Sequence, residues 1–271
     1  MLLAVHGDNI MATDSKVALV TGAARGIGLA TARKFLAEGW RVALLDIDNE
    51  NLRQTIGTLA LPDRTLALPC DVADAHGVSA AVAHVAGHFG RLDALVNNAG
   101  IAIFKPLLET TPADWARTLA VNLTGPFLCT QAAAPVMCDS GGGSIVNITS
   151  ISSLRASTLR VVYGTSKAGL AHLTKQQAVE LAALGIRVNA VAPGPVDTAM
   201  AMAVHTPEIR ADYHDTIPLN RYGLEDELAE VIFFLCSDRA SYVTGQTLSV
   251  DGGFEAAGIG LPTMRGARRN R

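Results

Sequence analysis

Short apolar runs alternate with longer amphipathic stretches along most of the chain. The runs are rich in β-branched residues and short enough for strands: VALV (17–20), RVALLD (41–46), LALP (66–69), LDALVNNAG (92–100), SIVNIT (144–149), IRVNAVAP (186–193) and TLSVDGG (247–253). Helical patterns fill the intervals between these runs. They cover a stretch from a Gly-rich turn to Glu38, a stretch that begins at Asn49, residues 74–89, Pro112 to about Met137, Tyr163 to Leu184, and residues 225–236. Strands that alternate with helices pair in parallel through right-handed crossovers. The pattern predicts an α/β fold with a doubly wound, parallel, seven-stranded sheet flanked by helices.

The two ends of the chain fall outside this pattern. Residues 1–14 are interpreted as an N-terminal extension, because the apolar run before His6 has only four residues, too few for a signal peptide. Residues 256–271 form a basic tail, for which a solvated end is expected and binding to an anionic surface is the alternative. Its last seven residues hold Arg265, Arg268, Arg269 and Arg271. Within the patterned domain, 15–255, residues 195–222 are the least regular and predict a lid.

Composition narrows the class of protein. Of 271 residues, 49% are apolar and 17% charged, as in a compact globular domain. The net charge of −3 offers no basic field for nucleic acid, and no apolar run is long enough to cross a membrane. His84 and His88 have a spacing that suits zinc but lack a third ligand, so we expect no metal. The cysteines show no CxxC spacing, so we expect a reducing, cytoplasmic location. They are Cys70, Cys129, Cys138 and Cys236.

A glycine-rich turn between the first strand and the first helix predicts a phosphate site. Gly22, Gly26 and Gly28 follow a G-x3-G-x-G spacing, and Arg25 and Ile27 lie between them. Glycines permit a tight turn, and the helix N-terminus beyond it favours an anion such as a pyrophosphate. An ordinary strand-to-helix turn is the alternative.

Carboxylates at the ends of the next two strands indicate which dinucleotide binds. Asp46 can accept hydrogen bonds from a ribose diol and would repel a 2′-phosphate, which favours NAD over NADP. Arg25 argues for NADP, because a guanidinium can pair with that phosphate. Asp71, followed by Val72, can reach an adenine amino group or cap the next helix.

Together these motifs resemble the short-chain dehydrogenase/reductase family. The resemblance runs from about Val17 to Gly253 and is carried, in order, by TGAARGIG (21–28), Asp46, DV (71–72), NNAG (97–100), VNLTGPF (121–127), SIVNITS (144–150), YGTSK (163–167), PGPVDT (193–198) and YVTGQTLSVDGG (242–253). It implies a single-domain Rossmann fold in which residues 15–255 are the dinucleotide-binding catalytic domain. It also implies a nicotinamide cofactor and, usually, a homotetramer.

The resemblance implies a catalytic group of four residues: Asn122, Ser150, Tyr163 and Lys167. Tyr163 and Lys167 are one helical turn apart, so their side chains share a face. An ammonium near a phenol lowers the phenol pKa, and Tyr163 can then exchange a proton with an alcohol. Ser150 would orient the substrate oxygen, with Ser152 and Ser153 as rivals. Asn122 would hold a water that links Lys167 to solvent, or be a satisfied helix-interior amide.

Further cofactor contacts are implied beside the nicotinamide. Asn98, Ala99 and Gly100 would pass along the cofactor, while Asn97 staples neighbouring strands. The segment 193–198 would close over the ring, where the Val196 backbone and the Thr198 hydroxyl are candidates for the carboxamide. The full set of expected cofactor residues is Gly22, Arg25, Gly26, Ile27, Gly28, Asp46, Asp71, Val72, Asn98, Ala99, Gly100, Tyr163, Lys167, Pro193, Gly194, Val196 and Thr198.

The expected reaction interconverts a secondary alcohol, of polyol, sugar or hydroxy-ketone type, and its ketone. An NADPH-dependent 3-oxoacyl-thioester reductase is the second possibility, and a non-catalytic dinucleotide-sensing scaffold is a third. Arg155 and Arg160 border the expected pocket and could meet an anionic or polar substrate, although exposure at the surface is commoner for arginine.

Overall fold

The structure is a computed structural model that describes residues 15–258. The expected N-terminal extension and the four arginines of the basic tail lie outside the described residues. No helix among the described residues is long and apolar enough to span a membrane.

A parallel sheet of seven strands forms the centre of the molecule. The strands are β1 (Val17–Thr21), β2 (Arg41–Asp46), β3 (Thr65–Pro69), β4 (Ala94–Asn97), β5 (Gly143–Ile148), β6 (Ile186–Pro193) and β7 (Thr247–Val250). Their order is β3-β2-β1-β4-β5-β6-β7, and every neighbouring pair is parallel. The predicted fold is confirmed, and the order reverses between β1 and β4, where such sheets bind ligands.

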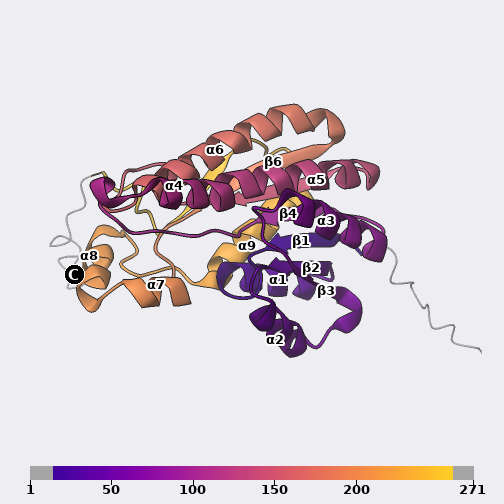
Figure 1. Cartoon of the computed structure of the whole chain (residues 1–271), viewed down its shortest axis with the longest axis horizontal. Coiled ribbons are helices and arrows are strands. Elements are labelled where there is room, and N and C mark those ends of the chain that lie inside the picture. Colours follow the sequence, from indigo (N-terminus) through magenta and orange to yellow (C-terminus); the bar gives the residue numbers. More distant parts are fainter. Residues whose placement is uncertain (1–14, 259–271) are drawn as a thin grey trace, which may run out of the picture.

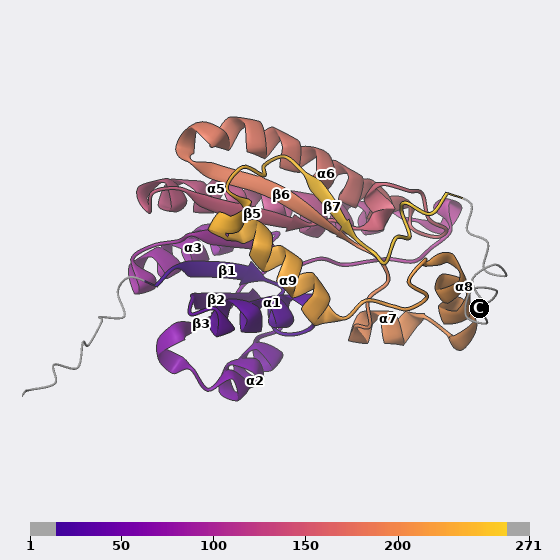
Figure 2. The ribbon, with the colours of Figure 1, turned by 180° about the vertical axis from the view of Figure 1, so that it is seen from behind.

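Each face of the sheet is covered by helices because successive strand residues point to opposite sides. In β1, Ala18 and Val20 join one apolar cluster, while Val17 and Leu19 join the other. The first cluster packs against α1 (Gly26–Ala37), α2 (Asn49–Leu59) and α9 (Glu225–Cys236). The second packs against α3 (Ala75–Phe89), α5 (Gly125–Asp139) and α6 (Val161–Leu181). Figures 1 and 2 show the two helical layers on either side of the strands.

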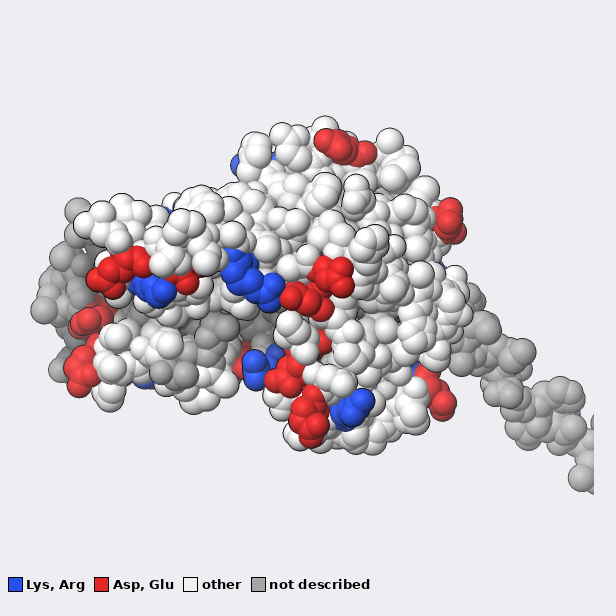
Figure 3. Space-filling view, in the orientation of Figure 1, with Lys and Arg blue, Asp and Glu red and all other residues white. Residues whose placement is uncertain are grey.

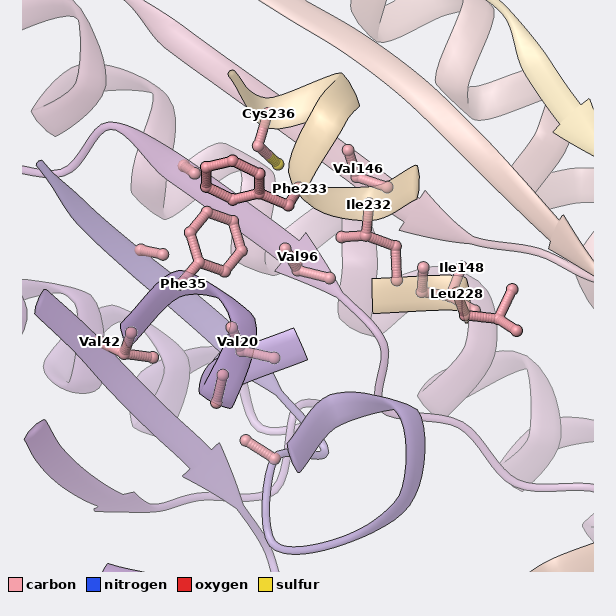
Figure 4. Packing of buried hydrophobic residues seen from close by; sticks show 14 of the residues in the cluster. Val20, Phe35, Val42, Val96, Val146, Ile148, Leu228, Ile232, Phe233 and Cys236 are labelled. Carbon is pink, nitrogen blue, oxygen red and sulfur yellow. The ribbon is translucent and has the colours of Figure 1, made fainter. Parts of the chain in front are cut away.

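Large apolar side chains join α1 and α9 over the sheet. Phe35 of α1 meets Phe233 of α9 in an edge-on contact with ring centroids 5.3 Å apart. Figure 4 shows the two rings next to each other, with Val20 and Val42 of the sheet below Phe35. This buried cluster holds α1, the helix that follows the glycine-rich turn, against the sheet.

The predicted helix from Pro112 to about Met137 is interrupted. It is divided into α4 (Pro112–Leu119), a π-helical turn (Ala120–Thr124) and α5. Pro126 has no N–H, so the Asn122 carbonyl cannot receive its α-helical hydrogen bond. The π-helical turn therefore lies where an expected catalytic residue sits, as such turns often do.

The segment predicted as a lid contains two short helices, α7 (Ala199–Val204) and α8 (Pro207–Thr216). They follow β6 and lie beyond the carboxyl end of the sheet (Figures 1 and 2). Acidic and basic side chains are interspersed on the face seen in Figure 3.

Candidate active site

A cleft of about 400 Å³ opens at the carboxyl ends of the strands. It is lined by most of the residues expected from the sequence: Gly22, Arg25, Gly26, Ile27, Asp46, Asp71, Val72, Asn98, Ala99, Gly100, Ser150, Tyr163, Lys167, Pro193, Gly194, Val196 and Thr198. Gly28 and Asn122 are not among its lining residues, and neither are Ser152 and Ser153, the rivals of Ser150.

Backbone conformation or lack of space requires glycine at each of the three glycine positions in the turn. Gly22 and Gly26 have φ of 64° and 63°, in the left-handed region that glycine adopts at little cost. A Cβ on Gly28 would lie 2.1 Å from the Gly22 carbonyl oxygen. Main-chain groups therefore approach the cleft directly, at the N-terminus of α1.

Asn98 holds this turn in place from the neighbouring strand. Its Nδ2 donates to the carbonyls of Thr21 and Gly22 at 2.9 and 3.0 Å. The Thr21 hydroxyl in turn accepts from the backbone N–H groups of Asn98 and Ala99, at 3.0 Å each. Asn97 donates to Asn147 on β5 at 2.8 Å, which confirms that it links adjacent strands.

Asp46 lies at the cleft with both carboxylate oxygens ordered by backbone N–H groups. One accepts from Ala24 at 3.0 Å and the other from Asp48 at 2.9 Å. The cap of α2 is Asp48, so Asp46 is not a helix cap. Arg25, with 71% of its side chain exposed, lies 3.6 Å from the Asp48 carboxylate.

Asp71 is paired with an arginine that sequence reasoning missed. Its Oδ2 lies 3.0 Å from Arg117 on α4, and Asp74 caps α3 instead. The two residues are far apart in the chain, so no local pattern signals this pair. The alternative of Asp71 as the cap of the following helix is therefore wrong.

Ser150, Tyr163 and Lys167 converge on one wall of the cleft. Ser150, after β5, is 6% exposed and forms a side-chain hydrogen bond with Tyr163. Lys167 is 4% exposed, and its Nζ donates to the Ile148 carbonyl at 2.7 Å. The Nζ atom lies 5.9 Å from the centroid of the Tyr163 ring. The α6 helix thus presents both residues to the end of β5.

One electrostatic expectation is wrong in direction. Burial raises the pKa of Tyr163 above its ordinary value of 10.0, against the smaller lowering effects of the Ser150 hydrogen bond and the Arg160 charge. Burial also lowers the pKa of Lys167 from 10.5 to about 8. Desolvation disfavours both charged forms and is the largest influence on the pKa of each group.

The Asn122 side chain is satisfied by the protein. Its Oδ1 accepts from Ile101 N–H at 2.9 Å, and its Nδ2 donates to the Ile101 carbonyl at 2.9 Å and the Ser166 hydroxyl at 3.0 Å. The amide joins the loop after β4 to α6. Any water held by Asn122 would therefore be held by its main-chain carbonyl, which lacks an α-helical donor because Pro126 has no N–H.

The segment after β6 has local structural roles as well. Thr198 caps α7 by accepting from Ala201 N–H at 3.1 Å, and its hydroxyl proton is still available. Val196 is 6% exposed and bridges to Gly223. A Cβ on Gly194 would lie 2.6 Å from that of Asp251, so this glycine also allows close packing.

The two arginines considered for substrate contact have different surroundings. Arg160 lines the cleft and donates to the Tyr213 hydroxyl at 3.2 Å. Arg155 donates to the Phe254 carbonyl at 2.8 Å and lies outside the cleft lining. His205 from the lid also lines the cleft, with its ring 5.2 Å from that of Tyr213.

The residues present fit a nicotinamide dinucleotide. The glycine turn has the backbone access that a pyrophosphate needs, and a carboxylate stands at the end of β2 for a ribose diol. Within residues 15–258, no group of three or more His, Cys, Asp or Glu side chains has the geometry of a metal site.

Known proteins share both the sequence and the fold. Residues 22–255 match the family model described as enoyl-(acyl carrier protein) reductase. The chain is 43% identical to 2-(R)-hydroxypropyl-CoM dehydrogenase of Xanthobacter autotrophicus, with 89% of this chain and 99% of the relative covered. It is 42% identical to 3-oxoacyl-[acyl-carrier-protein] reductase FabG of Thermotoga maritima, with 90% and 99% covered. The solved structure of levodione reductase superposes with a TM-score of 0.85 at 34% identity, covering 89% of this chain and 98% of that one.

These matches extend over nearly all of the described residues, and the relatives are named dehydrogenases and reductases. The chain belongs to the short-chain dehydrogenase/reductase family and is an NAD(P)-dependent alcohol dehydrogenase or ketone reductase.

Proposed function

We propose that the protein is an NAD-dependent dehydrogenase that interconverts a secondary alcohol and its ketone, with Ser150, Tyr163 and Lys167 as its catalytic residues. The observation that carries this proposal is the convergence of these three side chains on the cleft that also contains the glycine-rich turn.

In this proposal the protein's residues orient the substrate and move its proton. Ser150 and Tyr163 hold the substrate oxygen between their hydroxyls. Tyr163 accepts the hydroxyl proton during oxidation and returns it during reduction. Lys167 stabilises the phenolate that forms, since a positive charge nearby favours the ionised state. When bound, the nicotinamide accepts or donates the hydride.

The burial of Tyr163 has a chemical consequence. A raised pKa keeps more of the phenol protonated at neutral pH, ready to donate its proton in ketone reduction, and leaves less phenolate to act as the base in alcohol oxidation. Alcohol oxidation should therefore accelerate with rising pH until Tyr163 titrates. Asn122 acts as a positioning residue, because it ties Ile101 to Ser166 one residue before Lys167.

The preference for NAD over NADP rests on Asp46. Its carboxylate lines the cleft and is fixed by Ala24 and Asp48, so it cannot swing away from a 2′-phosphate without breaking two hydrogen bonds. Arg25 is near Asp48, whose charge offsets its attraction for that phosphate. We assign Asp71 and Val72 to the adenine, and Gly100 and 193–198 to the nicotinamide side.

A 3-oxoacyl-thioester reductase remains the second candidate, because one relative at 42% identity carries that name. Residues 195–222 are proposed to act as a lid, since His205 and Tyr213 reach the cleft from this segment.

We further propose a homotetramer and a cytoplasmic location. Phe127 on α5 and Val179 on α6 are 45% and 78% exposed, which supports an apolar subunit interface. The four cysteines are free, as in a reducing compartment. Light scattering that finds a monomer would contradict the assembly.

The test is a panel of secondary alcohols, polyols and 3-hydroxyacyl thioesters assayed with NAD and with NADP. Absorbance at 340 nm reports the reduced cofactor. The proposal expects kcat/KM to be larger with NAD and a non-thioester alcohol. Turnover restricted to NADPH and 3-oxoacyl thioesters would establish the second candidate instead.

A further inference from the structure

An arginine at the catalytic end of the cleft has no carboxylate partner within residues 15–258. The other two arginines that line the cleft are each near an acid: Arg25 near Asp48 at 3.6 Å and Arg117 near Asp71 at 3.0 Å. Arg160 takes part in none of the ion pairs of the described residues. It is partly buried, so its charge is only partly solvated.

The position of this guanidinium is fixed by its neighbours. Its central carbon lies 5.1 Å from the centroid of the Phe104 ring, and one Nη atom donates to the Tyr213 hydroxyl at 3.2 Å. The backbone of the preceding residue, Leu159, accepts from Lys105 N–H at 3.1 Å. A guanidinium carries five N–H donors, and the bond to Tyr213 is the one hydrogen bond that its side chain makes within the described chain.

The charges around the cleft are unevenly distributed. The carboxylates that line it among the described residues are Asp46, the last residue of β2, and Asp71, which follows β3, both at one edge of the sheet. Lys167 and Arg160 stand on the other side, near β5 and α6. Burial lowers the pKa of His205, and the charge of Arg160 adds to this lowering; the same charge opposes the rise that burial causes in the pKa of Tyr163, so it reaches the catalytic group. This end of the cleft therefore attracts anions.

We propose that the substrate carries a compact anionic group, a carboxylate or a sulfonate, which binds the Arg160 guanidinium and the Tyr213 hydroxyl while its alcohol carbon lies at Ser150 and Tyr163. The proposal deepens the proposed function and rests on it. The planar donor fork of arginine matches two oxygens of such a group. The Tyr213 hydroxyl accepts from Arg160 and keeps its own proton to donate.

The position of the anion site at Arg160 relative to the alcohol site at Tyr163 favours a short substrate. Arg160 immediately precedes α6 and stands three residues before Tyr163, so one helical turn separates their backbones. We therefore expect small hydroxy acids and hydroxy sulfonates as substrates. The anion is thus a specificity determinant, whereas the chemical step belongs to Ser150 and Tyr163.

The experiment compares each anionic substrate with a neutral counterpart of the same shape in the NAD-loaded enzyme. Hydroxy acids are compared with their primary amides, and hydroxy sulfonates with their sulfonamides. The two comparisons show whether the enzyme prefers a carboxylate or a sulfonate. Charge-assisted hydrogen bonds predict a kcat/KM about tenfold to hundredfold larger for the better anion than for its counterpart. Arg160→Gln should bring the ratio of kcat/KM for the anionic substrate to that for its neutral counterpart near one, chiefly by raising the KM of the anionic substrate. Arg160→Lys should restore part of this ratio.

Arg155→Gln is the matched control, because Arg155 is a neighbouring arginine outside the cleft lining and should leave the ratio unchanged. Calorimetry of each acid or sulfonate with the enzyme–NADH complex gives a readout that needs no turnover. Binding that Arg160→Gln abolishes, with NADH binding intact, supports the anion subsite.

Two failures are distinguishable. Oxidation of neutral alcohols with no advantage for any anion overturns the anion subsite and leaves the proposed function standing. A lack of turnover with every alcohol, together with Arg160-dependent anion binding, overturns the proposed function and supports the subsite. Anion binding that is absent, or that persists in Arg160→Gln, overturns the subsite in either case.

Discussion

The buried ammonium of Lys167 should destabilise the fold, and the structure gives the size of the effect. Lys167 is 4% exposed and donates to the Ile148 carbonyl, and it forms no ion pair with the described residues. Burial lowers its pKa from 10.5 to about 8. Because a pKa shift of one unit corresponds to 1.36 kcal/mol, the fold disfavours the charged state of Lys167 by about 3 kcal/mol.

The sign of the pH dependence follows from proton binding. Between pH 8 and 10.5 the unfolded chain holds a proton on Lys167 that the folded chain has released, so stability rises with pH. Above pH 10.5 the cost is absent, and it returns in full as the pH falls through about 8. At neutral pH the enzyme therefore carries a charge that reduces its stability.

Lys167→Met should remove this cost together with the activity. We expect the variant to be about 2 kcal/mol more stable than the native protein at pH 7, since the Ile148 carbonyl loses a hydrogen bond of about 1 kcal/mol. The advantage should shrink steadily between pH 8 and 10.5. Taking the difference between the two proteins at each pH cancels the titration of other groups.

Urea unfolding followed by circular dichroism at several pH values measures this difference. Lys175→Met is the control, because Lys175 lies on α6 with its side chain exposed and should show no such trend. A difference that stays constant with pH, or a Lys167→Met protein clearly less stable at pH 7, would refute the reasoning.

Two further predictions concern the cofactor side of the cleft. Gly28→Ala places a methyl group 2.1 Å from the Gly22 carbonyl oxygen. The clash should lower the free energy of unfolding in urea by about 1–3 kcal/mol and weaken NADH binding in fluorescence titration. Gly57→Ala, on α2 with nothing within 4 Å of the added methyl, should instead stabilise by about 0.5–1 kcal/mol, and equal effects of the two would contradict this account. Asp46→Ala should reduce the ratio of kcat/KM for NAD to that for NADP by about tenfold or more, because a like-charge repulsion is removed; an unchanged ratio would show that Asp46 does not select the cofactor.

The sheet could be predicted because its signals are local. Each strand is a short apolar run, and each motif lies at or just beyond the end of the strand that positions it, as Asp46 ends β2 and Ser150 follows β5. The carboxyl ends of parallel strands meet at one edge, so residues distant in the chain were expected together. For this reason the fold, the family and the outline of the cleft could be predicted from the sequence.

The features that were missed depend on contacts that no local pattern records. The Arg117–Asp71 pair joins α4 to the end of β3. The choice between Arg155 and Arg160 depends on where one loop turns toward the cleft. The pKa of Tyr163 was expected to fall because sequence spacing reveals the neighbouring lysine but not the extent of burial.

Proton transfer by Tyr163 is the central claim, and Tyr163→Phe tests it most directly. The substitution removes the hydroxyl that bonds to Ser150 and leaves the ring in place. The account predicts a kcat lower by about 10²- to 10⁴-fold, with an unchanged Kd for NADH in fluorescence titration. A Tyr163→Phe enzyme that keeps its kcat while binding NADH normally would contradict it.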